Sequence, residues 1–326
     1  MRNFLRPLTG LTCLFALATA GCSGTPEHES RGQEGPTAYA PYVSATEASA
    51  NDAAGSPASY NLAFVISDDS TCTPRWNGTH AVDDATVATR IGALKENGAS
   101  VRVSFGGASG KELAATCDSV SALAEAYGAA LDAAGSTQAD FDIEGDELTD
   151  SASVALRSRA IALLQRERPG LTVTFTLPVM PSGLDADGLA LLTSANTYDV
   201  QVSTVNLMTM NYGESYDGDM GDYAITSATA AHTQLAKLFG TSGAAAWRGM
   251  ALTSMIGVND VAGETFTLSN AAQVRTFAEG KGVGWVSMWS AFRDQQCGAD
   301  ASTEDALTTC SGVRQETGAF AEAFAR

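Results

Sequence analysis

Three acidic residues alternate with two apolar ones in the segment Asp140-Phe141-Asp142-Ile143-Glu144. On a β-strand, side chains point alternately to opposite faces, so the three acids share one face and the apolar pair shares the other. With a rise of about 3.3 Å per residue, successive acids on this face lie roughly 6.6 Å apart. Carboxylates this close in a partly desolvated site resist ionising together, so the row shares protons. A carboxyl group that stays protonated near neutral pH can act as a general acid, and Glu144, the last of the row, is the predicted acid.

Two other interpretations of this acidic row are open at this point. A solvent-facing edge strand is often acidic on its polar side, and its carboxylates then do no chemistry. Three carboxylates on one face are also suitable ligands for calcium or magnesium. The elements around the strand decide among these interpretations.

Apolar, β-rich segments alternate with longer helical segments along the rest of the chain. The expected strands lie at 61–66, 79–82, 101–105, 139–144, 171–177, 202–210, 250–255 and 283–289, and the expected helices include 83–97, 120–134, 151–168, 185–195 and 225–239. This alternation predicts a parallel sheet, and eight units over residues 58–326 predict one (β/α)8 barrel domain of the α/β class. The outer face of a barrel strand packs on helices, so Phe141 and Ile143 point outward and the acids point inward. Glu144 then lies nearest the C-terminal mouth, where barrel active sites form.

An open, doubly wound sheet is the alternative architecture. Such sheets usually carry a glycine-rich phosphate turn after their first strand. Here the first strand runs into Ser67-Asp68-Asp69-Ser70, which contains no glycine. The sequence therefore favours the barrel.

The N-terminal residues have the layout of an export signal. Arg2 and Arg6 precede an apolar run at 8–20 that is too short to span a bilayer. The run ends before Gly21-Cys22 and resembles a bacterial lipoprotein signal, which predicts a signal peptide at 1–21 and a lipid on Cys22; plain secretion is the alternative. Residues 22–57 have few large apolar side chains and are expected to form a disordered tether.

The charge of the chain excludes some partners. There are 19 basic and 37 acidic residues, giving a net charge of −18. Nucleic acids and anionic membranes attract basic surfaces, so neither is an expected partner, and membrane contact is expected only through a lipid anchor. A neutral polymer is compatible with this charge. A monomer is the default expectation.

Four cysteines remain once Cys13 and Cys22 are assigned to the export signal. They are Cys72, Cys117, Cys297 and Cys310. An even number in an exported chain suggests two disulfides, for which three pairings exist. Cys297 and Cys310 are close in sequence, so we expect this pair and, with it, Cys72–Cys117. A zinc site is the rival interpretation, but the chain has no short CxxC spacing and three histidines in all.

Several motifs together resemble glycoside hydrolase family 18, the chitinases and their relatives, over residues 58–326. The acidic row matches the last three acids of the family pattern DxxDxDxE, although Thr137 replaces its first Asp and Gln138 replaces a usual Gly. The other matching segments are Ser104-Phe-Gly-Gly107, Met208-Thr-Met-Asn-Tyr212 and Ser287-Met-Trp-Ser290, with Cys72-Thr-Pro-Arg-Trp76 and Arg293-Asp-Gln-Gln-Cys297 similar to a bacterial subgroup. They occur in the family's order on the strands expected above.

This resemblance implies a retaining, substrate-assisted hydrolysis of β-1,4-linked N-acetylglucosamine polymers, in which the substrate's own acetamido oxygen attacks the anomeric carbon. Glu144 would protonate the leaving oxygen and then activate water. Asp142 would orient the acetamido group and stabilise the cationic intermediate. Asp140 would hold Asp142 and tune its proton. The family implies no metal and no organic cofactor.

The resemblance also suggests the residues that bind sugar. Trp289 would form the floor under the sugar, with a core position as the rival interpretation, and Trp76 would extend the groove. Met210 and Asn211 stand where relatives often have Tyr and Asp, so Tyr212 is expected to supply the missing hydroxyl. Asn211 can hydrogen-bond the acetamido group but lacks a charge, which predicts a pH dependence unlike that of members with Asp.

Other functions stay open from the sequence. A non-catalytic sugar-binding protein and an endo-N-acetylglucosaminidase that acts on N-glycans would use the same barrel. A metal-dependent barrel enzyme is a further alternative.

Overall fold

The computed structural model describes residues 36–68 and 70–326. The predicted signal peptide at 1–21, the predicted lipidated Cys22 and the first part of the predicted tether lie outside the described residues.

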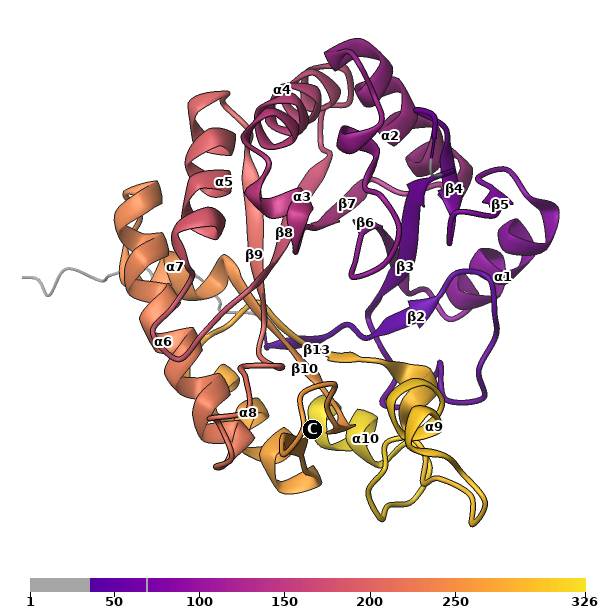
Figure 1. Ribbon diagram of the computed structural model, residues 1–326, viewed down its shortest axis with the longest axis vertical. Helices are drawn as coiled ribbons and strands as arrows, with labels where there is room; N and C mark the ends of the chain where they lie inside the picture. Colours follow the sequence, from indigo (N-terminus) through magenta and orange to yellow (C-terminus); the bar gives the residue numbers. More distant parts are fainter. Residues whose placement is uncertain (1–35, 69) are drawn as a thin grey trace, which may run out of the picture. The chain divides into compact units, whose positions relative to one another are not determined.

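Seven parallel strands form a continuous curved sheet, seen end-on in Figure 1. Their bounds are β3 (Ser59–Ser67), β6 (Ser100–Gly106), β7 (Gln138–Asp142), β8 (Thr172–Pro178), β9 (Val202–Met208), β10 (Met250–Met255) and β13 (Trp285–Trp289). They pair in the order β13-β10-β9-β8-β7-β6-β3. The strands expected from the sequence match these within a few residues, except that β7 and β9 end two residues earlier.

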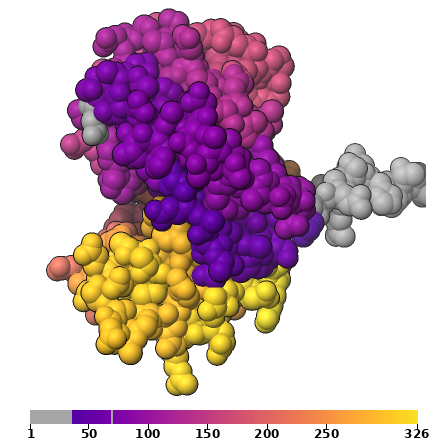
Figure 2. All heavy atoms as spheres, turned by 90° about the vertical axis from the view of Figure 1, so that its right-hand side faces the viewer, coloured from indigo at the N-terminus to yellow at the C-terminus, as the bar shows by residue number. Residues whose placement is uncertain are grey.

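An interrupted strand near the start of the described chain closes this sheet. β1 (Ala38–Tyr39) pairs in parallel with β13, and β2 (Tyr42–Ser44) pairs in parallel with β3. Between β1 and β2, the backbone oxygen of Ala40 accepts a hydrogen bond of 2.8 Å from the Asn61 side chain. Residues 38–44 therefore bridge the two edges and complete a (β/α)8 barrel. Figure 2 shows the indigo N-terminal and yellow C-terminal segments packed together.

Two sequence predictions are wrong at this closure. The segment 79–82 is not a barrel strand, because β5 (His80–Ala81) pairs antiparallel with β4 (Pro74–Trp76), which pairs antiparallel with the end of β3. Residues 36–57 are also not a disordered tether. They begin the barrel domain, since Tyr42 and Val43 are buried and the backbone around them joins the sheet.

Helices surround the barrel in Figure 1. The longer ones are α1 (Ala85–Lys95), α2 (Val120–Ala134), α4 (Ser151–Glu167), α5 (Ala186–Thr197), α6 (Met220–Phe239), α8 (Leu268–Lys281) and α10 (Ala319–Ala325), and the short ones are η1 (Leu113–Ala115), α3 (Asp146–Thr149), α7 (Gly243–Arg248), η2 (Ala291–Arg293) and α9 (Thr303–Thr308). The Asp84 side chain caps α1 by accepting from two backbone N–H groups. α6 begins five residues before the predicted start because Asp219 caps it at Met220.

Aromatic side chains fill the layer between the strands and helices. Phe105 of β6 and Phe141 of β7 stack with ring centroids 5.3 Å apart, and Tyr127 of α2 meets both edge-on. Phe141 thus points outward, as the alternation predicts. The opposite face of β7 carries Asp140 into the barrel interior, where it is fully buried.

Two disulfides stabilise the connections. Cys72 pairs with Cys117, and Cys297 pairs with Cys310, as predicted. The first closes a loop of 45 residues between the β3–β4 connection and the segment after η1. The second closes 13 residues around α9. Within the described part of the chain, no helix combines the length and apolarity needed to cross a membrane.

Candidate active site

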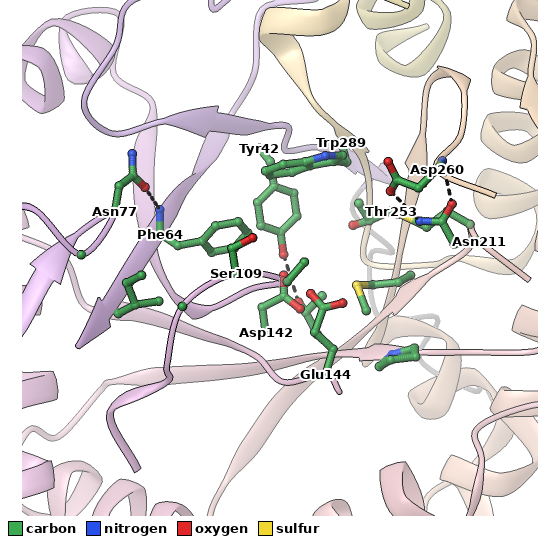
Figure 3. Close-up of a pocket in the computed structure, with 18 of the residues that line it drawn as sticks. Tyr42, Phe64, Asn77, Ser109, Asp142, Glu144, Asn211, Thr253, Asp260 and Trp289 are labelled. Atoms are coloured by element: carbon green, nitrogen blue, oxygen red, sulfur yellow. Dashed lines mark hydrogen bonds between the residues drawn. The ribbon is translucent and has the colours of Figure 1, made fainter. Parts of the chain in front are cut away.

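A cavity of about 710 Å³ opens at the C-terminal ends of the barrel strands (Figure 3). Its lining comes from residues far apart in sequence: Tyr42, Phe64, Ile66, Asn77, Gly78, Thr79, Ala108, Ser109, Gly110, Asp142, Glu144, Thr176, Pro178, Met208, Met210, Asn211, Thr253, Asp260 and Trp289. Asp142 ends β7 and Glu144 follows two residues later, so the predicted acid lies at the barrel mouth. A cavity of this size and aromatic content suits a small-molecule or oligosaccharide site.

Asp140 lies beneath the cavity inside a cage of hydroxyl groups. Its Oδ2 accepts from Tyr42 at 2.8 Å and from Ser104 at 2.6 Å, and its Oδ1 accepts from Thr176 at 2.7 Å. Burial raises the pKa of Asp140, while these hydrogen bonds and the Arg102 charge oppose the rise. No hydrogen bond joins Asp140 to Asp142 in the described chain. Asp140 acts on Asp142 through its charge, which raises the pKa of Asp142, and the expectation that Asp140 holds Asp142 stays a prediction.

Asp142 is buried but incompletely bonded. Its Oδ1 has no hydrogen-bond partner among the described residues, and its side chain lines the cavity. Burial raises the pKa of Asp142 well above the ordinary value, and the charges of Glu144 and Asp140 raise it further. Burial and the neighbouring acids thus favour the protonated form of this carboxyl group, and no hydrogen bond among the described residues engages either of its oxygens.

The backbone around Asp142 explains why the segment Ser104-Phe-Gly-Gly107 contains two glycines. Gly106 has φ +98°, and a Cβ there would lie 2.2 Å from the Asp142 carbonyl oxygen. The Gly107 N–H donates to that same oxygen at 2.9 Å. These glycines allow β6 to approach β7 closely, so their role is structural.

Glu144 is partly buried beside Asp142. Burial raises the pKa of Glu144 first, and the carboxylate of Asp260 raises it further. Asp260 reaches the cavity from the connection after β11 (Gly257–Val258), opposite β7. A raised pKa keeps Glu144 protonated to higher pH, which is the state a general acid needs.

Aromatic rings form one wall of the cavity. Trp289 stacks on Phe64 with centroids 5.5 Å apart and meets Tyr42 edge-on at 6.0 Å. Figure 3 shows Trp289 above Asp142 and Glu144. Trp289 therefore lies at the cavity and not in the core between barrel and helices. Its indole face can pack against the C–H face of a sugar ring.

The segment directly after β9 contributes Met210 and Asn211 to the cavity lining. Asn211 has a left-handed backbone, with φ 54°. Its Nδ2 donates to Asp260 Oδ2 at 3.0 Å, and its Oδ1 accepts from the Asp260 N–H at 3.1 Å. The carboxamide predicted to hold the acetamido group is thus engaged with Asp260.

Two predicted sugar-binding residues lie away from the cavity. Tyr212 is buried among Tyr216 and Tyr223, because the left-handed turn at Asn211 reverses the chain direction. Trp76 is fully buried, and its Nε1 donates to the Val82 oxygen at 3.3 Å. Both residues belong to the core, so the predictions for them are wrong.

The cavity residues that were not predicted include Tyr42, Phe64 and Asp260. Phe64 and Tyr42 border Trp289, and Asp260 faces Glu144. Tyr42 lies in the aromatic segment 39–43 within the supposed tether, and its apolar character was the available signal. Asp260 lies in a connection with no periodic pattern, so the sequence offered no sign of it.

The side chains that the structure places around the cavity are not arranged to bind a metal ion. The described residues contain no group of three His, Cys, Asp or Glu side chains placed to hold an ion. The hydroxyls around Asp140 donate their hydrogens to it, which occupies the lone pairs that a cation would need.

Comparisons with known proteins agree with this geometry. No protein-family model matches the chain. It is 35% identical over 309 residues to a probable bifunctional chitinase/lysozyme of Escherichia coli, covering 88% of this chain and 34% of that protein. It is 34% identical over 274 residues to Endochitinase 11 of Metarhizium anisopliae, covering 78% and 52%. The chain spans between a third and about half of the length of these curated relatives.

A solved structure of similar fold is the catalytic domain of a hyperthermophilic chitinase from Pyrococcus furiosus. The TM-score is 0.77 at 28% identity, and the match covers 89% of this chain and 94% of that one. The fold is thus a (β/α)8 barrel like that of this chitinase domain, with an acid-lined cavity at its C-terminal mouth. Over most of its length, the chain is similar to proteins named as chitinases.

Proposed function

We propose that the protein is a chitinase that hydrolyses β-1,4-linked N-acetylglucosamine polymers with retention of configuration. The observation that carries this proposal is the buried Asp142 carboxyl group, which has no hydrogen-bond partner among the described residues and lines an aromatic-walled cavity together with Glu144. A buried acceptor without a partner costs free energy unless a ligand supplies a donor. The acetamido N–H of a bound sugar supplies that donor.

The reaction follows from the positions of the two acids. Glu144 gives its proton to the glycosidic oxygen as the bond to the anomeric carbon breaks. The acetamido oxygen of the same sugar forms a new bond to that carbon, and its nitrogen becomes part of a cationic ring. Glu144, now a carboxylate, removes a proton from water, which opens the ring and restores the acetamido group. Two displacements at one carbon retain its configuration.

Asp142 and Asp140 support the charge that develops. Asp142 accepts the acetamido N–H and stabilises the positive charge of the ring as it forms. Asp140 cannot reach the sugar, because it is fully buried under its hydroxyl cage. Its negative charge raises the pKa of Asp142, so Asp140 acts on the reaction through that neighbouring carboxyl group.

The finer features of the protein are also part of this proposal. Both disulfides fit an oxidising compartment, which supports export from the cytoplasm. We propose a lipid anchor on Cys22, which lies outside the described residues, and a monomeric barrel. The alternatives of a sugar-binding protein and an enzyme acting on N-glycans find no support in the relatives, which are named as chitinases.

A product profile on defined chitooligosaccharides tests the function. We expect the wild type to release shorter N-acetylated products with the β-configuration retained, followed by NMR of fresh product. Glu144→Gln should abolish turnover and keep binding, measured by calorimetry. Glu96→Gln is the matched control, because Glu96 is exposed at the end of α1, near the start of β6 and so at the opposite end of the strands from the cavity. Wild-type turnover by Glu144→Gln would remove Glu144 as the acid.

A further inference from the structure

The charged side chains that line the cavity are all acidic. They are Asp142, Glu144 and Asp260, and no lysine or arginine stands among the lining residues of the described chain. The proposed reaction uses the first two and gives Asp260 no contact with substrate. A neutral N-acetylglucosamine polymer also gains little from a third carboxylate, so the question is what this one binds.

Asp260 is held in place but keeps one oxygen free. Asn211 fixes it through a reciprocal pair of hydrogen bonds, which engage Oδ2 and the backbone N–H. No hydrogen bond or ion pair among the described residues engages Oδ1. Arg293 acts on it only at longer range, since its guanidinium is buried and donates to the backbone oxygens of Trp289, Val258 and Ala306.

A second observation indicates that the same cavity contains hydrogen-bond acceptors that lack donors among the described residues. Asp142 Oδ1 is buried and has no hydrogen-bond partner in the described chain, and the Asp142 residue lines the cavity together with Asp260. Trp289 lines the same cavity as Asp260. An aromatic face and a carboxylate in one cavity favour a cation, because both attract positive charge.

Building on the proposed chitin hydrolysis, we propose that Asp260 forms a subsite for a glucosamine unit and binds its ammonium group. The sugar that reacts must keep its acetamido group, because the acetamido oxygen attacks the anomeric carbon. The ammonium therefore belongs to a neighbouring unit of the chain. The favoured substrate is then partly deacetylated chitin, whereas a fully deacetylated chain is not cleaved.

Hexasaccharides that each carry one glucosamine at a different position, compared with the fully acetylated hexasaccharide, test this proposal. At one position, glucosamine should raise kcat/KM roughly two- to fivefold, the range of a partly exposed ion pair. Asp260→Asn should remove this gain, since the amide keeps an oxygen for Asn211 but loses the charge. Any effect of Asp260 on the pKa of Glu144 acts on all substrates equally. It therefore cancels when kcat/KM for a glucosamine-containing hexasaccharide is divided by kcat/KM for the fully acetylated one. The gain should also disappear in about 1 M salt, where the Debye length is about 3 Å.

The Kd of each glucosamine-containing hexasaccharide is also compared with the Kd of the fully acetylated one in the Glu144→Gln background. This ratio of Kd values is independent of turnover. Glu96→Gln removes one charge elsewhere and should leave the ratio unchanged. The inference fails if no glucosamine position improves on the fully acetylated chain, or if the gain persists in Asp260→Asn. Absence of cleavage of the acetylated hexasaccharide by the wild type contradicts the proposed function instead, and the Kd ratio still decides the role of Asp260.

Discussion

The hydroxyl of Tyr42 donates a hydrogen bond of 2.8 Å to Asp140, across 98 residues of sequence. Tyr42 lies on the strand that closes the barrel, and Asp140 lies on β7 on the far side of the interior. Tyr42 Oη also lies 3.0 Å from Thr176 Oγ1, and Asn206 Nδ2 donates to Thr176 Oγ1 at 3.0 Å. Closure of the barrel and support of the acidic row are thus parts of one network.

Tyr42→Phe should lower the free energy of unfolding by about 1.5–3 kcal/mol, the usual contribution of a hydrogen bond to a charged group. Loss of this donor should also raise the pKa of Asp140, because the bond favours its ionised form. Urea unfolding measures the first effect. Tyr39→Phe is the matched control, since the buried Tyr39 hydroxyl has no partner among the described residues and its loss should cost little. Equal effects of the two substitutions would contradict the role given to Tyr42.

The pH dependence of turnover should follow the raised pKa of Glu144. Burial and the charge of Asp260 raise this pKa, so the acid stays protonated above its usual range and activity falls as pH rises through the raised value. Asp260→Asn should therefore move the basic limb of the kcat profile to lower pH. Glu96→Gln should leave the limb in place. A basic limb that moves to higher pH in Asp260→Asn would refute this electrostatic coupling.

Asn211→Asp should destabilise the protein most at neutral pH. A carboxylate cannot donate to Asp260 Oδ2 and repels it, so about 1–2 kcal/mol of unfolding free energy should be lost. The close pair raises the folded-state pKa of one carboxyl above its unfolded value. The free energy of unfolding of the variant is therefore highest below the unfolded-state pKa of this carboxyl group. It decreases as pH rises through the folded-state pKa. Thermal unfolding between pH 4 and 8, about the working range of these groups, measures this trend, and Asn97→Asp, at an exposed position, should show none of it.

Arg157 and Glu112 should show strong energetic coupling. Arg157 Nη2 lies 2.7 Å from Glu112 Oε2, and both side chains are 1% exposed. Arg157→Met should cost about 3–5 kcal/mol because it leaves a buried carboxylate unpaired, whereas the double variant with Glu112→Gln should cost much less than the sum. Urea unfolding of the four proteins gives the cycle. Arg168→Met breaks the exposed pair with Asp132 and should cost about 1 kcal/mol or less. Additive single effects would contradict the coupling.

Trp289→Ala should reduce kcat/KM on chitooligosaccharides about ten- to thirtyfold, a loss of about 1.4–2 kcal/mol. The reason is the loss of the indole face from the cavity wall, where Trp289 stacks on Phe64. Trp247→Ala is the control, because Trp247 packs against His232 and Phe277 on the outer helices. Steady-state kinetics of both variants should separate them. A similar loss in both would point to destabilisation instead of lost sugar contact.

The sequence by itself determined the parts that depend on local pattern. The period of two in Asp140-Phe-Asp-Ile-Glu144 places the acids on one face of a strand, and the apolar pair identifies the outer face. The alternation of strands and helices predicts the barrel, and the short spacing of Cys297 and Cys310 predicts the disulfide pairing. These features follow from the geometry of single elements and their neighbours along the chain.

Only the tertiary structure decided which distant residues meet at the cavity. The strand formed by residues 38–44 is short and interrupted, so the sequence pattern does not predict it. Its pairing with β3 and β13 stabilises it. The left-handed backbone at Asn211 turns Tyr212 into the core and brings Asn211 to Asp260. Barrel closure joins the two ends of the domain, and such contacts leave no periodic trace in the sequence, because each depends on both partners and on the backbone that places them.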